Sequence, residues 1–365
     1  MGGPFCKDLY QKGVGIRSMP TNSNKFVACI ANNDPNQELY LDTAAELSKI
    51  DRKNHKQVND KGIPLVYDLM VSVTVPEKKG LVSANNPQLL GSVVVKTAPN
   101  NWQTRNAVRM AHFTREDLRK EAGVKKGSIG RYARNLRCNL DPTMYAIAYD
   151  PTGNLGTGAQ PVAQRIYAQR ELSFSTINGL GHAGERFEGG TWDYTQLAQV
   201  ESGDANTADA FYLNVCESHS ATAPGPYAYI GMLQAYNQRR QTTLDDSTLT
   251  SGGDTQFINN DSPFFRIPEQ DVSEDEYVQI TLDEQDEPPY DRRIGAGPAL
   301  SVDSKKAQPC DFFQLTTFQS THTFRVQAPL GLLKFELQDL LGSSEDNINR
   351  QYIGFEVECL GTYEM

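Results

Sequence analysis

The sequence lacks the long apolar runs and leader segments by which membrane and exported proteins are recognised. No stretch of its 365 residues approaches the roughly eighteen consecutive apolar residues that a membrane-spanning helix needs. Residues 1–10 contain no apolar core of a signal peptide, and Cys6 stands where an N-myristoylation motif requires Ser or Thr. We therefore expect synthesis in a cytoplasm, with the six widely spaced cysteines reduced and buried.

The common catalytic and nucleotide-binding motifs are also missing from the sequence. It contains no G-x-x-x-x-G-K-[ST], G-x-S-x-G or H-E-x-x-H. The glycines of residues 179–184 fit G-x-G-x-x-G, but residues 185–190 cannot begin the helix that a dinucleotide site requires, which favours a loop. Cys216 and His219 have C-x-x-H spacing without a second pair nearby, which favours a buried thiol. We expect neither an enzyme nor a cofactor nor a small-molecule substrate.

The composition indicates a thin core and long polar loops. Hydrophobic residues make up 38% of the chain and charged residues 22%, with a net charge of -10. Such a share of apolar residues suits two packed sheets. An acidic chain is a poor general nucleic-acid binder, because phosphate affinity comes from Lys and Arg.

Short strands separated by turn residues account for most of the chain after residue 60. In residues 65–75, β-branched and other apolar side chains alternate with Ser72, Thr74 and Met70, a period of two that is typical of a half-buried strand. Further strands are expected at residues 92–97, 144–149, 171–177, 210–216, 227–233, 277–282, 312–318, 323–328, 332–337 and 352–360. This pattern predicts an all-β sandwich or jelly roll, pinned at its C-terminus by a strand.

Two segments differ from the strand pattern. Residues 1–60 read as an arm with one short helix that opens at Thr43, where Glu46 completes a capping box. Residues 101–140 read as helical, with a capping box at Thr114 and Asp117 and a left-handed closing residue at Gly123.

The charge is segregated along the chain. Residues 101–140 hold ten Lys/Arg against three acids, so this segment carries +7 and the rest of the chain -17. Its cations and aromatics suit a nucleic acid or an anionic membrane, but we favour pairing with acids of a neighbouring subunit. The candidate contact residues are Arg105, Arg109, Arg131, Arg134 and Arg137.

Two weaker candidate sites each have a structural explanation that is favoured over a binding role. Residues 271–291 contain nine acids and no Lys or Arg, so Asp283, Glu284 and Asp286 are candidates for a cation between subunits, although a solvated loop is favoured. Trp192 and Asp193 would suit a sugar subsite, although an aromatic side chain packed under a loop is favoured.

Four pieces of the sequence together resemble the double jelly-roll major capsid proteins of tailless icosahedral, membrane-containing bacteriophages, of the finnlakevirus-like kind. They are APNNW (98–102), GTWDYT (190–195), EPPYD (287–291) and APLGLL (328–333). The resemblance implies an all-β fold of two jelly-roll β-sandwiches side by side, with a few short helices in the connecting loops. The domains would be the arm (1–60), a first jelly roll (61–225) that includes the helical insertion 101–140, and a second jelly roll (226–365).

The resemblance also implies a structural role without catalytic residues. Three copies would form a trimer with a pseudo-hexagonal outline, and such trimers would tile the icosahedral shell of a virion. The expected partners are neighbouring capsomers, other virion proteins such as a penton, and internal membrane lipid or the viral genome. A carbohydrate-binding or carbohydrate-active β-sandwich protein is the alternative, because fold alone does not determine function.

Overall fold

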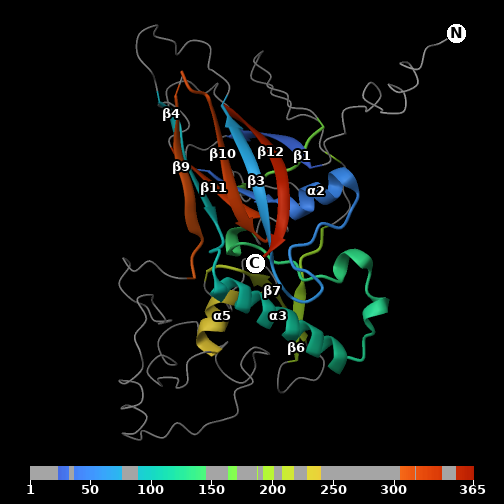
Figure 1. Ribbon diagram of the computed structural model, residues 1–365. Helices are drawn as coiled ribbons and strands as arrows, with labels where there is room; N and C mark the ends of the chain where they lie inside the picture. The colour runs from blue at the N-terminus through green and yellow to red at the C-terminus, as the bar shows by residue number, and fades with distance from the viewer. Residues whose placement is uncertain are drawn as a thin grey trace, which may run out of the picture.

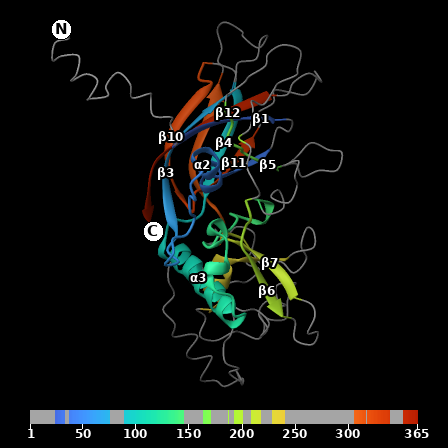
Figure 2. The ribbon, with the colours of Figure 1, turned by 90° about the vertical axis from the view of Figure 1, so that its right-hand side faces the viewer.

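The computed structural model consists of a β-sandwich with a smaller unit of helices and strands at one end of it (Figures 1 and 2). The structure describes residues 24–32, 37–75, 89–144, 163–170, 187, 192–200, 208–217, 228–239, 305–316, 318–338 and 351–365. These residues form mostly β-sheet with few helices, which agrees with the predicted all-β class.

The sandwich is built from eight strands that come from the two ends of the chain. The first four are β1 (Lys25–Asn32), β2 (Glu38–Asp42), β3 (Leu65–Thr74) and β4 (Leu89–Thr97). The last four are β9 (Gln308–Thr316), β10 (Thr321–Pro329), β11 (Leu332–Gln338) and β12 (Gln351–Glu364). They pair antiparallel as β1 with β12, β2 with β11, β3 with β10 and β4 with β9. The eight strands therefore pair like the two arms of one long hairpin, with β1 to β4 in one arm and β9 to β12 in the other.

This hairpin is rolled into two facing sheets. One sheet has the order β1-β12-β3-β10, and the other has the order β5-β2-β11-β4-β9, where β5 (Ala163–Arg165) adds a parallel edge strand to β2. The rolling is visible in the pairs β12 with β3 and β11 with β4, which join neighbouring turns of the roll. A hairpin of eight strands wound in this way is a jelly roll. These eight strands thus form one jelly roll.

Alternation of apolar and polar residues explains why these strands form and how the sheets face each other. In β3, Leu69, Val71 and Val73 are buried and the residues between them are half-buried. The rings of Phe335 on β11 and Phe355 on β12 meet between the two sheets, with 5.1 Å between their centroids. The core of the jelly roll is thus the apolar layer between the sheets.

We call residues 98–304, which lie between β4 and β9, the insertion, and its described residues form a second unit. Its described elements are α3 (Trp102–Glu121), the 3-10 turns η1 (Lys126–Ser128) and η2 (Arg131–Ala133), β5, β6 (Gln196–Val200), β7 (Ala208–Asn214), β8 (Ala228–Gly231) and α5 (Met232–Arg239). The strands β6-β7-β8 form a sheet in which β7 and β8 are parallel. A second cluster of buried apolar side chains lies in this unit, and α3 packs on α5 through Trp102 and Tyr236.

Most predicted strands that fall on described residues are confirmed, including the C-terminal strand β12. The range 227–233 was predicted too long, because α5 begins at Met232. The predicted strands 171–177 and 277–282, and nearly all of 144–149, lie outside the described residues, as does the glycine motif at 179–184. Strands β1, β2, β5 and β6 were not predicted.

The arm needs correction. Residues 1–60 were expected to stand apart from the sandwich, but β1 and β2 lie within its two sheets. The helix α2 (Thr43–Asp51) opens where it was predicted, although its N-cap is Asp42, whose Oδ1 accepts a hydrogen bond from the amide of Ala45. The apolar residues of β1 contribute directly to the core, so β1 and β2 belong to the sandwich rather than to an arm.

The domain division at residues 225 and 226 separates strands that pair with each other. Strand β3 lies between β12 and β10, so residues on both sides of the predicted boundary share one sheet. The helical stretch 101–140 is confirmed only in its first half by α3, because residues 122–140 contain only the short 3-10 turns η1 and η2. Its capping box at Thr114 and Asp117 is wrong, because the helix already begins at Trp102 with Asn101 as its N-cap. Gly123 has the expected left-handed conformation, with φ of 68°.

Candidate interaction surface

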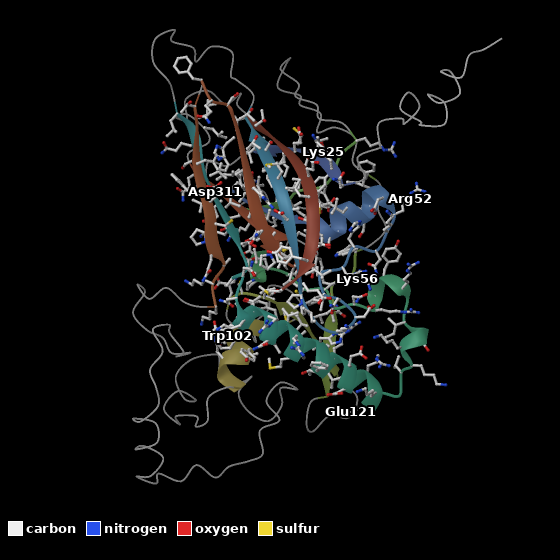
Figure 3. All side chains as sticks on the ribbon, viewed as in Figure 1. Lys25, Arg52, Lys56, Trp102, Glu121 and Asp311 are labelled. Carbon is white, nitrogen blue, oxygen red and sulfur yellow. The ribbon has the colours of Figure 1, made fainter. Side chains whose placement is uncertain are left out.

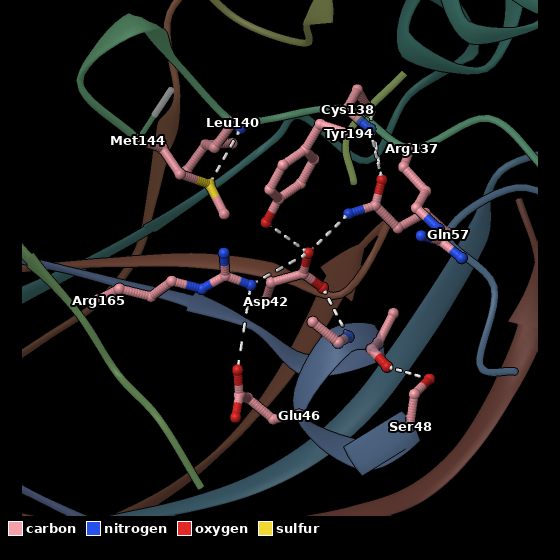
Figure 4. A network of polar contacts seen from close by, with 12 residues as sticks. Asp42, Glu46, Ser48, Gln57, Arg137, Cys138, Leu140, Met144, Arg165 and Tyr194 are labelled. Carbon is pink, nitrogen blue, oxygen red and sulfur yellow. Dashed lines mark hydrogen bonds and ion pairs between the residues drawn. The ribbon is translucent and has the colours of Figure 1, made fainter. Parts of the chain in front are cut away.

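A buried cluster of charged side chains joins the insertion to the jelly roll. Asp42, at the end of β2, accepts hydrogen bonds through Oδ2 from the Tyr194 hydroxyl (2.9 Å) and from Gln57 Nε2 (3.2 Å). The guanidinium of Arg165 lies 3.9 Å from Asp42 Oδ2 and 3.9 Å from Glu46 Oε1. Figure 4 shows these side chains converging from β2, α2 and the insertion.

The charges of this cluster are held almost entirely out of water. Asp42 and Glu46 are completely buried, and Glu46 also accepts hydrogen bonds from the amide of Ala168 (2.8 Å) and from Lys49 Nζ (2.8 Å). Burial raises the pKa of Asp42, whereas Arg165 and the hydrogen bonds to the carboxylate act to lower it. Burial acts to lower the pKa of Arg165, but Tyr194, Asp42 and Glu46 outweigh it and raise that pKa. Charges buried in this way are destabilising unless an opposite charge or hydrogen bonds compensate them.

A second polar contact fixes the insertion against the outer face of the same sheet. The hydroxyl of Tyr40 on β2 lies 2.8 Å from Asp141 Oδ2, and Lys334 Nζ on β11 lies 3.4 Å from the same oxygen. Asp141 Oδ1 accepts a hydrogen bond from the amide of Met144 at 2.8 Å. The insertion is therefore held at two places on strands β2 and β11.

These contacts position an exposed, positively charged region of the insertion. We call it the basic surface and define it by residues on α3 and on the segment that follows it. Its members are Trp102, Arg105, Arg109, Phe113, Lys120, Lys125, Lys126, Arg131, Tyr132 and Arg134. Apart from Arg105, which is half-buried, all of them are exposed.

Helix α3 presents only one side to solvent because its other side is packed. Ala107, Val108 and Ala111 are fully buried in the core of the insertion. The exposed side chains of Trp102, Arg109 and Phe113 lie seven and four residues apart, which places them along one side of the helix. Figure 3 shows α3 with Trp102 at its start and Glu121 at its end.

The segment after α3 is held against the helix by backbone carbonyls. Arg115 on α3 donates to the carbonyls of Ala133 (2.6 Å) and Arg134 (2.8 Å). From the other side, Asn54 Nδ2 donates to the Arg131 carbonyl (3.2 Å) and the Tyr132 hydroxyl donates to the Arg52 carbonyl (3.2 Å). The side chains of residues 131–134 are thus fixed beside α3 while remaining exposed.

The structure divides the five predicted arginines into two kinds. Arg109, Arg131 and Arg134 are exposed and Arg105 is half-buried, so these four belong to the basic surface. Arg137 is 4% exposed, which corrects its prediction as a contact for a partner. Its guanidinium donates to the Asp193 carbonyl (3.2 Å) and to the Tyr132 carbonyl, and burial lowers its pKa.

Arg137 also contacts Trp192 of the candidate sugar subsite. Its guanidinium carbon lies 3.8 Å from the centroid of the Trp192 ring, so the cation covers one face of the indole. Trp192 packs partly buried against both apolar cores. This arrangement agrees with the expected packed aromatic side chain. Asp283, Glu284 and Asp286 lie outside the described residues.

The cysteines differ in part from the expectation. The five cysteines of the described ranges are thiols rather than disulfides, and Cys29, Cys138 and Cys216 are buried. Burial raises the pKa of Cys29 to about 11 and that of Cys216 well above its usual value, so these thiols are protonated at neutral pH. Cys310 on β9 is exposed, which contradicts the prediction that every thiol would be buried.

Sequence reasoning missed the buried charged cluster. Two of its members are distant in the sequence from Asp42, because Arg165 and Tyr194 meet it only after the insertion has folded back on the jelly roll. The one local signal was Asp42 itself, an acid that ends strand β2 and directly precedes α2. Acids in that position are typical N-caps.

The described residues offer no alternative in the form of a metal site or a membrane-spanning helix. Among the described residues, no group of three or more His, Cys, Asp or Glu side chains is arranged to hold a metal ion. No helix in the described ranges is long and apolar enough to cross a membrane. No family model, curated protein or solved structure matches this chain. The basic surface is therefore our strongest candidate for an interaction.

Proposed function

We propose that this protein is a structural coat protein that assembles with copies of itself into an icosahedral virus shell. The observation that carries the proposal is the strand order of the sandwich, β1-β12-β3-β10 against β2-β11-β4-β9, which is that of a jelly roll. Jelly rolls are a recurrent fold of capsid subunits, and also of lectins and cupins. The proposal therefore needs further support from the particular features of this chain.

Two features favour a coat protein over a ligand-binding jelly roll. The space between the sheets is filled by large apolar side chains, including Phe335 and Phe355, as in a sandwich that serves as a building block. The insertion is fixed to one end of the roll by the Asp42–Arg165 contact, so the subunit presents a second body at a defined place. Long segments between strands provide the surface that contacts with neighbours require.

The finer proposal concerns the arrangement of subunits. We infer a trimer with a pseudo-hexagonal outline, in which neighbouring capsomers, a penton protein and the shell's contents are the partners. Because β9 to β12 pair with β1 to β4, a second jelly roll would have to come from the insertion, residues 98–304. The packed trimer interface would supplement the modest apolar core, since obligate interfaces bury large apolar areas.

The carbohydrate-binding alternative lacks a specific observation in its favour. Aromatic rings that stack on sugars need an open face, whereas the Trp192 ring is covered by Arg137. We therefore keep this alternative as an outcome of the experiment below.

Assembly of the full-length purified chain tests the proposal. Native mass spectrometry is expected to give a species of three times the 40.5 kDa of one chain, and electron microscopy is expected to show six-sided outlines or closed particles. The control is the buried-core variant Phe335→Ala, in which loss of the fold should remove every assembly. A chain that stays monomeric at high concentration and binds an immobilised oligosaccharide would contradict the proposal.

A further inference from the structure

The outward side of α3 carries aromatic and cationic side chains in one row. Trp102, Arg105, Arg109 and Phe113 follow one another at intervals of three or four residues. At 1.5 Å per residue, about 16 Å of helix separate the two aromatic residues. Trp102 is 39% exposed and Phe113 is 51% exposed, and the guanidinium carbon of Arg109 lies 6.0 Å from the Phe113 ring centroid.

A second group of cations and one more aromatic ring adjoin this stripe. Lys125, Lys126, Arg131 and Arg134 are exposed, and Tyr132 is 45% exposed. The bonds from Arg115 to the carbonyls of residues 133 and 134 hold this group beside α3. The basic surface thus contains three exposed aromatic rings set among cations.

Acids within the segment do not cancel this charge. Residues 101–115 and 122–140 contain no Asp or Glu. Of the acids between them, Glu116 pairs with Arg119 (2.8 Å) and Asp117 with Lys120 (3.1 Å). The surface is therefore positive although the whole chain carries -10. Positive charge concentrated on an acidic protein is a local feature that attracts a polyanion.

We propose that the basic surface binds single-stranded nucleic acid, with phosphates on the cations and bases stacked on Trp102, Phe113 and Tyr132. A cationic groove or surface with exposed aromatic rings is how proteins bind single strands without sequence preference. If the protein is the coat protein proposed above, this surface is where its shell contacts the packaged genome. The binding itself rests only on the surface described here.

The chemistry favours a nucleic acid over the two other polyanionic partners. A helix that lies on a membrane needs a continuous apolar side toward the lipid. On α3 that apolar side, with Val108 and Ala111, is buried in the insertion, and the exposed side interrupts its aromatics with Arg105 and Arg109. An acidic protein surface would pair with the cations but would not use the exposed parts of the three rings.

Binding can be measured by fluorescence anisotropy with the full-length protein and a labelled single strand of about 20 nucleotides, longer than the usual site of one binding module. The double variant Arg131→Gln/Arg134→Gln should bind about tenfold more weakly near 0.1 M salt, because each lost phosphate contact lowers the salt dependence by about 0.7. The variant Phe113→Ala should also bind several-fold more weakly, with the salt dependence unchanged.

The matched control is Lys25→Gln/Arg325→Gln, which removes two charges from the jelly roll. Lys25 pairs with Glu356 and Arg325 with Asp68, away from the insertion. This control should bind like the wild type. Equal loss in the control and the surface variant, or no binding at low salt, would overturn the inference, as would binding that Phe113→Ala leaves unchanged.

Two further measurements separate this inference from the proposed function. Vesicles rich in phosphatidylserine should not compete for the surface, and competition by them that abolishes binding of the strand would identify lipid as the partner and overturn the inference. The Arg131→Gln/Arg134→Gln variant should assemble like the wild type. If it loses assembly in the absence of nucleic acid, the surface is a contact between copies and the inference fails. A wild-type chain that binds the strand but never assembles would refute the coat protein alone.

Discussion

Arg165 is the residue on which the contact between insertion and jelly roll depends most. Its guanidinium is the cation that faces both Asp42 and Glu46 from the insertion, with Lys49 on α2 as the second cation near Glu46. Removing one partner of a buried ion pair leaves an uncompensated charge and costs about 3–5 kcal/mol. Because 3.9 Å exceeds a hydrogen-bond length, this contact acts as an ion pair rather than through a shared proton.

We predict that Arg165→Met lowers the free energy of unfolding at pH 7 by about 3 kcal/mol. Denaturant titration monitored by tryptophan fluorescence measures this change, because Trp192 packs against both cores. Arg131→Met serves as the control, because the side chain of Arg131 is exposed and its replacement should change stability by less than about 0.5 kcal/mol. An equally stable Arg165→Met protein would contradict this role.

The same variant should show a characteristic dependence on pH. Burial raises the pKa of Asp42, and loss of Arg165 removes a group that lowers it. A carboxyl whose pKa is raised in the folded state contributes stability below its unfolded pKa, and this contribution is lost as pH rises through the folded pKa. The groups that face Asp42 are Glu46, Gln57, Tyr194 and Arg165. The stability deficit of the variant should therefore shrink as the pH falls from 7 toward 5.

At the scale of elements, the sequence predicted those strands whose own residues alternate between apolar and polar. Strand β3 was recognisable because alternate burial is written into its residues. Strand β1 instead has a continuous apolar run from Phe26 to Ala31 without a period of two, and its partner β12 lies at the other end of the chain, so it was not recognised. Its register, with Phe26 opposite Val357, depends on a contact across most of the chain. Such pairings have no signal within a window of one strand.

The turn between β10 and β11 offers a test of an element boundary. Here the chain crosses from one sheet to the other, and Gly331 has φ of 71° while its carbonyl accepts a hydrogen bond from the amide of Thr43 (2.9 Å). A Cβ at this position would lie 3.0 Å from the Tyr67 ring and 3.2 Å from Thr43 Cβ. Both the backbone conformation and the space therefore favour glycine.

We predict that Gly331→Ala lowers the free energy of unfolding by about 1–3 kcal/mol, because strain at positive φ and crowding add together. Thermal unfolding followed by circular dichroism gives the shift. The matched control is Gly127→Ala, since a Cβ at Gly127 would meet nothing within 4 Å. Loss of stability in the control alone, or in neither variant, would contradict this reading of the turn.

At the scale of the whole molecule, the insertion is a very long loop of one hairpin. Thr97, the last residue of β4, is paired with Gln308, the first residue of β9, so the chain leaves the roll and returns to it at one place. The composition and strand pattern predicted a β-sandwich or jelly roll, but not that the insertion would interrupt one roll, because the pairing of β4 with β9 spans the whole insertion. The basic surface was predicted as a segment, and folding decided which arginines remain exposed.

This topology leads to a prediction about what the insertion contributes. Replacing residues 98–307 by a short Asn-Gly turn would join β4 to β9 as an ordinary hairpin. The excised chain would lose Arg165 and leave Asp42 and Glu46 without it, so we expect it to fold poorly at pH 7.

The same excision combined with Asp42→Asn and Glu46→Gln should restore a cooperative unfolding transition with a β-rich circular dichroism spectrum. Both variants lose the nucleic-acid binding of the basic surface, because residues 102–134 are gone. If neither variant unfolds cooperatively, the jelly roll requires the second apolar cluster as well as the charges, because Tyr40, Leu330 and Leu332 of the roll pack into that cluster.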